Sequence, residues 1–257
     1  MHKLVLVLCA AAAAVVSVNA RGSVAEAAEV KVLTSVALTA ALNELAPRFE
    51  KATADKLNIV YGLAAEMKKR VLDGETADVI LITRPMMDDL QKQNKLAAGT
   101  LVDVAGTPVA IAARAGAPKP DIGTVDAFKR TLLAAKSVAY SDPAKGGVSG
   151  VHFAHVLERL GIADQMKPKT ILVSGALAPE LVAKGEAELG VGQGSEIVPV
   201  AGVQLVGALP GELASTTVFA AAVGAESKSA AAAKALIVFL TGPDAAPTFK
   251  AKGFEPR

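Results

Sequence analysis

Residues 141–150 have the composition of an anion-binding turn, because they read Ser-Asp-Pro-Ala-Lys-Gly-Gly-Val-Ser-Gly. Glycine lets the backbone approach a ligand closely. A turn that opens a helix presents unpaired N–H groups and the positive end of the helix dipole, and Lys145 adds a cation. An ordinary loop in which Ser149 caps a helix produces the same pattern. The order GxxxxGK[ST] of a nucleotide-binding P-loop is absent.

The segments on either side of this turn predict a strand before it and a helix after it. Residues 137–140 form an apolar, strand-like run. From Val151 onward, apolar residues recur at helical spacing, as at Ala154 and Leu157. A strand, a glycine-rich turn and a helix in this order place an anion at the start of the helix.

Apolar periodicity predicts alternating strands and helices along most of the chain. The expected strands are 30–35, 57–62, 77–82, 101–113, 137–140, 170–173, 188–192, 204–207 and 216–221. The expected helices are 38–54, 64–72, 86–93, 124–135, 149–160, 178–185, 229–240 and 244–252. Such alternation indicates an α/β protein with mostly parallel sheets that are flanked by helices on both faces.

The proline- and glycine-rich segment 115–121 predicts a hinge that divides the chain into two lobes. Lobe 1 is expected to begin with residues 29–113, and lobe 2 to span residues 114–206. Residues 207–257 then return to lobe 1 and end in helices. Two such lobes place the carboxyl ends of several strands around one cleft, which is the expected binding site.

The predicted strand ends carry neutral hydrogen-bonding groups and a few cations that suit a small anion. The candidate ligand-binding residues at these ends are Ser35, Tyr61, Thr83, Arg84, Lys145, Gly147, Val148, Ser149 and Gln193. Arg84 directly follows the third strand, where its guanidinium would grip a carboxylate in a bidentate way. A surface salt bridge from Arg84 to Asp88 is the alternative, and the sequence does not decide between the two.

Two histidines three residues apart, His152 and His155, would fit one face of a helix and bind a metal. A packed or half-exposed pair is favoured, because no second group of ligands is evident. The chain has no HExxH motif, nucleophile elbow or dinucleotide fingerprint, so we predict no metal and no cofactor. The catalytic residues are unknown; the candidates for a general base are His152, His155, Glu196, Glu66 and Tyr61.

The N-terminus predicts export to the periplasm. Residues 1–20 read as a signal peptide, with Lys3 before a long apolar run and a small-residue cleavage site at its end. The single cysteine, Cys9, lies inside it, so the exported protein would have no thiol chemistry. Loss of Lys3 lowers the formal charge from +2 to +1. We therefore expect a soluble monomer that binds neither nucleic acid nor a membrane surface.

Several motifs occur in a fixed order along the mature chain. They are Leu38-Thr39-x-Ala41-Leu42, Gly74-x-x-Ala77-Asp78-Val79, Ser141-Asp142-Pro143, Phe239-Leu240-x-x-Pro243 and Phe249-Lys250-x-x-Gly253-Phe254. In this order they resemble the periplasmic molybdate-binding protein family. The resemblance implies a two-lobed periplasmic binding fold (type II), which delivers an oxyanion to the membrane subunits of an ABC importer.

The chain departs from the family where serine hydroxyls hold the oxyanion. By alignment these positions fall at Ala37 and at residues 63–65, so the resemblance adds Ala37 and Ala64 to the candidate site residues. The family's tyrosine near the end of lobe 2 falls at Gln193. Each unpaired molybdate oxygen would cost about 1–3 kcal/mol. The lost hydroxyls therefore disfavour molybdate.

A divergent branch of the family matches this chain better. The branch carries the glycine turn at residues 141–150, Gly-Glu-Ala-Glu-Leu-Gly at 185–190 and Ser-Glu-Ile at 195–197, and it resembles periplasmic aconitate isomerase. The leading hypothesis is a solute-binding protein of an ABC importer that takes a small anion, an organic di- or tricarboxylate. The alternative is an isomerase of the aconitate type on the same scaffold. An inorganic oxyanion receptor that uses backbone N–H groups also stays open.

Overall fold

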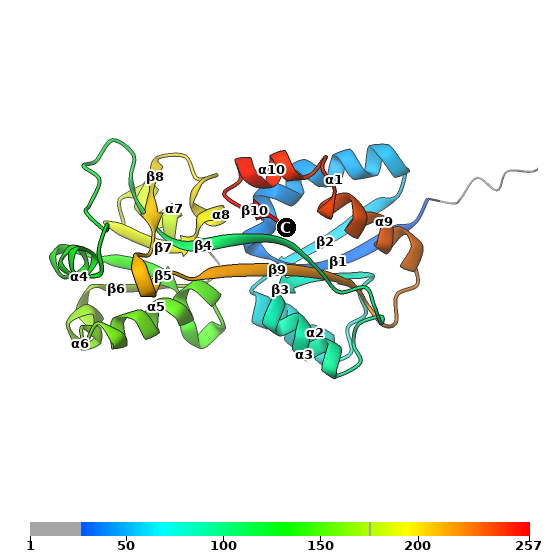
Figure 1. The fold of residues 1–257 in the computed structure, drawn as a ribbon, viewed down its shortest axis with the longest axis horizontal. Coiled ribbons are helices and arrows are strands. Elements are labelled where there is room, and N and C mark those ends of the chain that lie inside the picture. The colour runs from blue at the N-terminus through cyan, green and yellow to red at the C-terminus, as the bar shows by residue number, and fades with distance from the viewer. Residues whose placement is uncertain (1–26, 175) are drawn as a thin grey trace, which may run out of the picture.

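Two lobes that share one continuous mixed sheet make up the chain in the computed structural model (Figure 1). The structure describes residues 27–174 and 176–257. The predicted signal peptide, residues 1–20, lies outside the described residues. Lobe 1 comprises residues 27–108 and 215–257, and the segment between them forms lobe 2.

Lobe 1 contains three parallel strands in the order β2-β1-β3, followed by the antiparallel strands β9 and β4. Its strands are β1 (Glu29–Ser35), β2 (Lys56–Gly62), β3 (Val79–Thr83), β9 (Thr216–Val223), β10 (Glu255–Pro256) and the first half of β4 (Val102–Arg114). Its helices are η1 (Val36–Leu38), α1 (Thr39–Thr53), α2 (Ala64–Leu72), α3 (Arg84–Lys92), α9 (Ala230–Thr241) and α10 (Ala246–Ala251).

Lobe 2 repeats this plan with the order β4-β7-β5-β6, in which β7, β5 and β6 are parallel and β8 pairs with β4. Its strands are β5 (Val138–Ser141), β6 (Thr170–Val173), β7 (Leu189–Gln193) and β8 (Val203–Ala208). Its helices are α4 (Val125–Ala134), η2 (Pro143–Lys145), α5 (Val148–Arg159), α6 (Ala163–Met166), η3 (Lys167–Lys169), α7 (Ala178–Lys184), α8 (Gly194–Ile197) and η4 (Gly211–Leu213).

Helices cover both faces of the lobe 1 sheet (Figure 1). Helices α1, α9 and α10 pack on one face through side chains such as Phe49, Leu236 and Phe249. Helices α2 and α3 pack on the other face through Met67 and Leu90. All five residues of β3 are buried, as expected for a strand that is covered on both faces. The two-lobed α/β arrangement predicted from the periodicity is therefore confirmed.

The two lobes are joined where β4 and β9 run side by side. Residues up to Pro108 pair with β9 in lobe 1, with Pro108 opposite Thr216. From Val109 onward, β4 pairs with β7 and β8 in lobe 2. The Val109 N–H donates to the Ser215 carbonyl across 2.9 Å. This adjacent pair of extended crossovers is the connection about which the lobes would rotate.

The structure places the crossover before the proline- and glycine-rich segment 115–121. That segment is a loop of lobe 2, since the Ala115 N–H donates to the Gly202 carbonyl and the Gln204 side chain donates to the Ala117 carbonyl. It is not the hinge that its composition suggested. Proline and glycine mark any exposed turn, whereas the crossover runs through Gly106 and Pro108 inside the longer, mostly apolar strand β4, where two such residues did not stand out.

The lobe boundaries shift accordingly. Residues 109–113 belong to lobe 2, because Val109 and Ile111 pack in its core. Leu209 and Leu213 pack there too, so the return to lobe 1 comes after η4. Every strand and helix expected from the periodicity is present within a few residues. The short elements α6, α8 and β10 and the four 3₁₀ turns were not predicted, since two to four residues carry too little periodicity.

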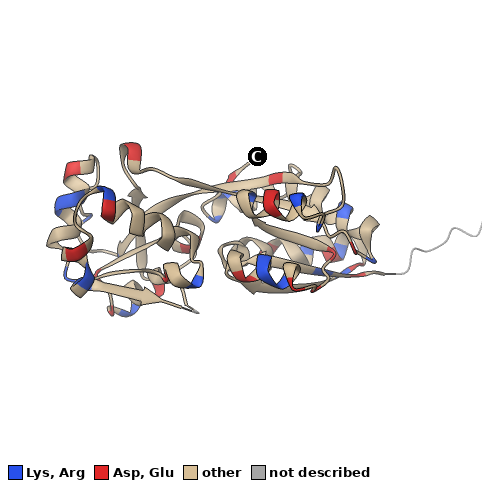
Figure 2. Cartoon of the chain, turned by 90° about the horizontal axis from the view of Figure 1, so that it is seen from below, with Lys and Arg blue, Asp and Glu red and all other residues tan. Residues whose placement is uncertain are grey.

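Charged side chains of both signs are scattered over the helices of both lobes (Figure 2). This mixture agrees with the small formal charge of the sequence. None of the described helices combines the length and the apolar character that crossing a membrane requires.

Candidate functional site

A pocket lies between the lobes at the carboxyl ends of β1, β2, β5 and β7. Its empty space is about 320 Å³ when the part that is open to solvent is included, and the enclosed part is small in this conformation. The residues that line it are Ser35, Val36, Ala37, Leu63, Ala64, Ser141, Gly146, Gly147, Val148, Ser149, Gln193, Glu196 and Phe219. Among these residues there is no lysine or arginine.

Two helices begin at this pocket without a side-chain cap. Helix α2 of lobe 1 starts after Leu63, and helix α5 of lobe 2 starts after Gly147; neither preceding residue supplies a capping hydrogen bond. In α5 the Gly150 N–H is taken by Ser141 Oγ, but the other N–H groups of the two first turns have no capping side chain from the preceding residue, and the positive ends of two helix dipoles meet at one place. This arrangement attracts an anion without any cationic side chain.

The start of α5 is fixed against the end of β5. The Gly150 N–H donates to Ser141 Oγ across 3.1 Å, and Ser141 Oγ lies 3.2 Å from Ser149 Oγ. A Cβ atom at Gly150 would lie 1.7 Å from the Ser141 carbonyl oxygen. Glycine is therefore required here, because the helix starts in direct contact with the strand.

The two lobes touch each other at the rim of the pocket. Gly146 has φ +79°, and a Cβ atom on it would lie 2.5 Å from the Ala65 Cβ in α2. Val148 packs on a lobe 1 cluster that includes Ala64 and Met67. The glycine turn of lobe 2 thus closes against the start of α2 in this conformation.

A second set of polar groups faces the same pocket from β7 and α8. The Gln193 N–H donates to Glu196 Oε2 across 2.9 Å, and Gln193 Nε2 donates to Thr217 Oγ1 of lobe 1, also across 2.9 Å. Gln193 is only 2% exposed, yet its Oε1 has no hydrogen-bond partner among the described residues. A buried acceptor without a partner is costly, and a ligand or an ordered water would supply the missing donor.

Glu196 is the one carboxylate that lines the pocket among the described residues. It keeps some contact with solvent through the pocket, but protein atoms surround it. This desolvation raises the pKa of Glu196 to about 7, although the hydrogen bond from the Gln193 N–H acts in the opposite direction. A carboxyl group with such a pKa exchanges protons readily near neutral pH.

Seven of the candidate site residues come together at this pocket. They are Ser35, Ala37, Ala64, Gly147, Val148, Ser149 and Gln193. Their role in ligand binding stays a prediction. Ser35 Oγ accepts a long hydrogen bond of 3.4 Å from the Ala37 N–H and so caps η1.

The other four candidates lie outside the pocket. Tyr61 packs on the lobe 1 core and its hydroxyl donates to Asn43, while burial raises its pKa to about 12. Arg84 forms the salt bridge to Asp88 that was weighed as an alternative, and it also binds Asp103. Thr83 and Arg84 line a neighbouring hollow, and Lys145 is exposed on η2.

Six of the lining residues were not among the candidate ligand-binding residues, although four of them, Val36, Leu63, Ser141 and Gly146, belong to strand-end loops that the sequence places at the cleft. The six are Val36, Leu63, Ser141, Gly146, Glu196 and Phe219. Ser141 and Gly146 belong to the glycine turn, and Glu196 was among the candidate bases. Phe219 comes from β9, which returns from lobe 2, and no local pattern reveals that a distant strand passes the cleft.

The described residues contain no group of three or more histidines, cysteines and carboxylates that would hold a metal ion. His152 Nε2 lies 2.9 Å from the Leu213 carbonyl oxygen, and His155 lies beside Glu158 on the exposed side of α5. The two histidines therefore have structural partners of their own.

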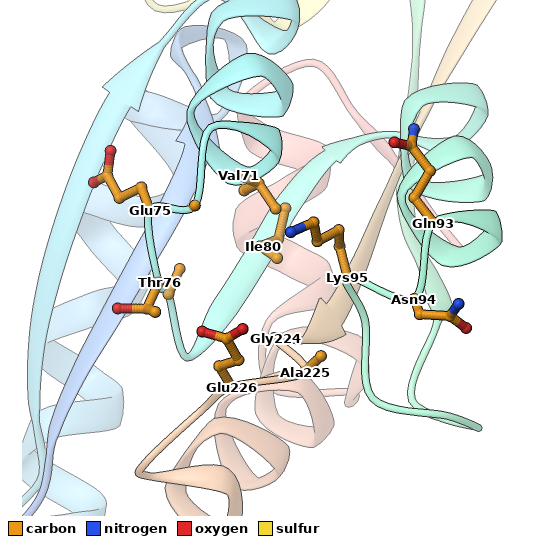
Figure 3. A pocket seen from close by; sticks show the side chains of 12 residues that line it. Val71, Glu75, Thr76, Ile80, Gln93, Asn94, Lys95, Gly224, Ala225 and Glu226 are labelled. Atoms are coloured by element: carbon orange, nitrogen blue, oxygen red, sulfur yellow. The ribbon is translucent and has the colours of Figure 1, made fainter.

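Another hollow, of about 480 Å³, lies at the opposite edge of the lobe 1 sheet (Figure 3). Its walls come from the α2–β3 loop, the end of α3 and the segment after β9, and include Glu75, Lys95 and Glu226. Ligands of open α/β sheets bind beyond the carboxyl ends of the strands. This hollow lies at the amino end of β3, so the pocket between the lobes is the stronger candidate.

Most of the chain matches one known family. The family model described as bacterial extracellular solute-binding protein matches residues 30–255. The chain belongs to this family. It is the family of periplasmic solute-binding proteins that serve ABC transporters.

Two named members of this family illustrate its range. The chain is 36% identical over 231 residues to aconitate isomerase from Pseudomonas sp, covering 88% of this chain and 87% of that protein. It is 27% identical to the molybdate-binding protein ModA of Escherichia coli (strain K12), covering 91% of this chain and 92% of that protein. These two comparisons confirm the resemblance to molybdate-binding proteins and to aconitate isomerase that was inferred from the motifs.

The fold agrees with a solved member. The periplasmic molybdate-binding protein of Azotobacter vinelandii superimposes with a TM-score of 0.75 at 21% identity, covering 88% of this chain and 98% of that chain. This likeness confirms the type II periplasmic binding fold that the resemblance implied.

Proposed function

We propose that this solute-binding protein holds a small organic di- or tricarboxylate in the pocket between its lobes. The observation that carries the proposal is the meeting of two helix N-termini, α2 from lobe 1 and α5 from lobe 2, at one pocket; neither N-cap residue, Leu63 or Gly147, caps its helix with a side chain. An anion between them would be bound by N–H groups of both lobes. Ligand binding would then favour the closed arrangement of the lobes by its differential affinity for that state.

The donors and acceptors of the pocket favour a carboxylate over molybdate. Glu196 lines the pocket and offers its carboxylate oxygens as acceptors. A tetrahedral metal oxide has acceptor oxygens on every side, so some of them would meet these groups. A carboxylate ligand confines its charge to its ends and has carbon between them. It can place its oxygens at the helix starts and its carbon atoms beside Glu196.

We further propose that the chain is exported and passes its ligand to the membrane subunits of an importer. Membership of the family supports this role. Rotation about the paired crossovers near Pro108 and Thr216 would open the pocket for exchange.

A second candidate function is isomerisation of a tricarboxylate of the aconitate type. The 36% identity to an aconitate isomerase favours it over a purely binding role. The scaffold would be unchanged, and the bound ligand would be converted before release.

A thermal-shift screen tests the proposal with purified mature protein and with molybdate, tungstate, sulfate, citrate, cis-aconitate and trans-aconitate. A ligand at a hundred times its Kd stabilises the fold by about 2.7 kcal/mol. We expect a shift with at least one carboxylate. A shift with molybdate or tungstate alone would contradict the proposal.

A further inference from the structure

The pocket contains one group that can exchange protons with a bound ligand. Of the five candidate bases, Glu196 alone lines it. Glu66 is exposed on α2, and the Tyr61 hydroxyl is bonded to Asn43 in lobe 1. His152 and His155 have partners of their own, Leu213 and Glu158.

The backbone around Glu196 holds its carboxylate in one position. One oxygen, Oε2, accepts the Gln193 N–H in the capping box of α8. A Cβ atom at Gly192 would lie 3.0 Å from the same oxygen, so the strand end passes close behind the carboxylate. The other oxygen, Oε1, has no hydrogen bond to any residue that the structure describes. It is therefore free to act on a ligand.

The charges in the pocket define how a tricarboxylate would lie. Its carboxylates would go to the N–H groups at the starts of α2 and α5, since the Glu196 carboxylate repels them. The carbon chain between the carboxylates would then face Glu196. This orientation places carbon-bound hydrogens, rather than oxygens, beside the free oxygen Oε1.

We infer that Glu196 is the catalytic residue that moves a proton between two carbon atoms of an unsaturated tricarboxylate. The inference rests on the proposed function, because it requires that the pocket take such a ligand. It assigns chemistry to a residue that would otherwise serve only as the cap of a four-residue helix.

The proton transfer is balanced without any co-reactant. The Glu196 carboxylate takes a proton from the methylene carbon next to the double bond. The electron pair of the broken C–H bond delocalises over the allylic system and its carboxylate, whose negative charge the helix N-termini stabilise. The resulting carboxylic acid returns the proton to the far end of the allylic system. The double bond has then moved, and Glu196 has regained its starting charge.

The environment of Glu196 suits this role. Desolvation raises its pKa to about 7, and a general base works best when its pKa is close to the working pH. Positioned general bases typically contribute 10²–10⁴-fold to a rate.

The decisive experiment compares wild type with Glu196→Gln in D₂O. Proton NMR would follow deuterium uptake into cis-aconitate and trans-aconitate and the conversion of one into the other. Glutamine keeps an oxygen for the Gln193 N–H, so the cap of α8 is retained while the base is lost. We expect exchange to fall by about 100-fold or more, with a Tm at least as high as that of the wild type and aconitate still bound in the thermal-shift assay.

Glu158→Gln is the matched control, because Glu158 is an exposed carboxylate on α5 and lies outside the pocket. It should exchange at the wild-type rate. In the wild type, the exchange rate should rise with pH through about 7 and then level off. A purely structural cap would not produce this profile, so the profile tests the inference even if Glu196→Gln fails to fold.

Three outcomes would overturn the inference. If Glu196→Gln exchanged deuterium at the wild-type rate, another residue would transfer the proton. The same conclusion would follow if Glu66→Gln lost exchange while Glu196→Gln kept it. Binding of aconitate by the wild type without any deuterium uptake would leave the proposed function standing and refute the inference. If the protein bound no carboxylate at all, both the proposed function and the inference would be refuted.

Discussion

The Gln193 N–H donates to the Glu196 carboxylate, while the Gln193 side chain donates to Thr217 of lobe 1. Gln193 thus ties the carboxylate of the pocket to the strand that crosses between the lobes. Any change in the angle between the lobes would alter the hydrogen bond from Gln193 to Thr217 directly. It would alter the hydrogen bond from Gln193 to Glu196 indirectly, because both bonds involve Gln193. This relationship links the chemistry of the pocket to the closure of the lobes.

Closure of the lobes should depend on the missing side chain at Gly146. A Cβ atom there would lie 2.5 Å from the Ala65 Cβ across the cleft, and overpacking of this kind costs about 1–3 kcal/mol. We expect Gly146→Ala to weaken binding of any carboxylate that stabilises the wild type by about tenfold. Thermal-shift titration measures this loss, and small-angle X-ray scattering should show a larger radius of gyration.

Gly161→Ala provides the matched control for Gly146→Ala. Gly161 also has a positive φ, +65°, but a Cβ atom on it would meet nothing within 4 Å. Both variants should lose about 1–2 kcal/mol of stability from the strained backbone. Only the variant at the lobe contact should lose affinity. Equal affinities in the two variants would show that this contact does not control closure.

The free energy of unfolding should fall as the pH rises through about 7. The pKa of Glu196 is raised from 4.5 to about 7 in the folded protein, so the folded state holds a proton that the unfolded state has already released. Stability is therefore highest below the unfolded pKa and decreases until the pH passes the folded pKa. No other titratable side chain lines the pocket among the described residues.

Urea denaturation of wild type and Glu196→Gln at pH 4.5 and pH 8.5 measures this dependence, because the loss of stability begins near the unfolded pKa of 4.5 and is complete above about 7. A shift of this size corresponds to about 3 kcal/mol at most, and solvent contact through the pocket reduces it. The glutamine variant should lack this loss of stability. Parallel pH profiles for the two proteins would rule out Glu196 as the titrating group.

The Asp78 carboxylate should contribute substantially to the stability of lobe 1. Its buried carboxylate accepts hydrogen bonds from the Ser227 hydroxyl and from the backbone N–H groups of Lys31, Lys228 and Ser229. Burial alone would raise the pKa of Asp78, but these hydrogen bonds outweigh it and lower the pKa below its ordinary value. The contribution of the ionised Asp78 to the free energy of unfolding is therefore fully present above the ordinary pKa of an aspartate. It is lost as the pH falls through the lowered pKa of Asp78 in the folded protein.

Asp78→Asn should cost about 2 kcal/mol at pH 7, because the amide nitrogen would face donors that a carboxylate oxygen now accepts. Guanidinium denaturation of both proteins measures the difference. The gap should narrow in acid, where the wild-type carboxylate is protonated as well. A gap that stayed constant down to pH 2 would contradict the electrostatic explanation.

Thr107 should hold the C-terminal turn against α8. Its buried hydroxyl accepts the Ser195 N–H across 3.1 Å and donates to the Gly253 carbonyl across 3.0 Å. Thr107→Val keeps the shape but leaves both backbone groups without this partner, at a cost of about 1–3 kcal/mol. Thermal unfolding should show this loss, and Thr107→Ser should recover most of it. If serine did not restore stability, the methyl group rather than the hydroxyl would be responsible.

The sequence by itself determined the secondary structure and the two-lobed α/β plan. Strand and helix periods are local properties, so the helix at 64–72 and the strand at 170–173 were predicted at their observed bounds. The glycine turn at 141–150 was singled out from the sequence because glycines, a hydroxyl and a helix start are adjacent in the chain, and it lines the pocket between the lobes. Motif order alone led to the correct family.

Only the tertiary structure decided which strand ends share a pocket. Arg84 and Tyr61 lie at strand ends, as Ser35 does, but they do not reach the pocket. Arg84 forms ion pairs with Asp88 and Asp103. The Tyr61 hydroxyl donates a hydrogen bond to Asn43. Glu196 became important because Phe219 and the start of α2, both far away in sequence, line the same pocket, and because burial raises its pKa. Desolvation depends on every atom around a group, and these atoms come from both lobes, so no local pattern can encode it.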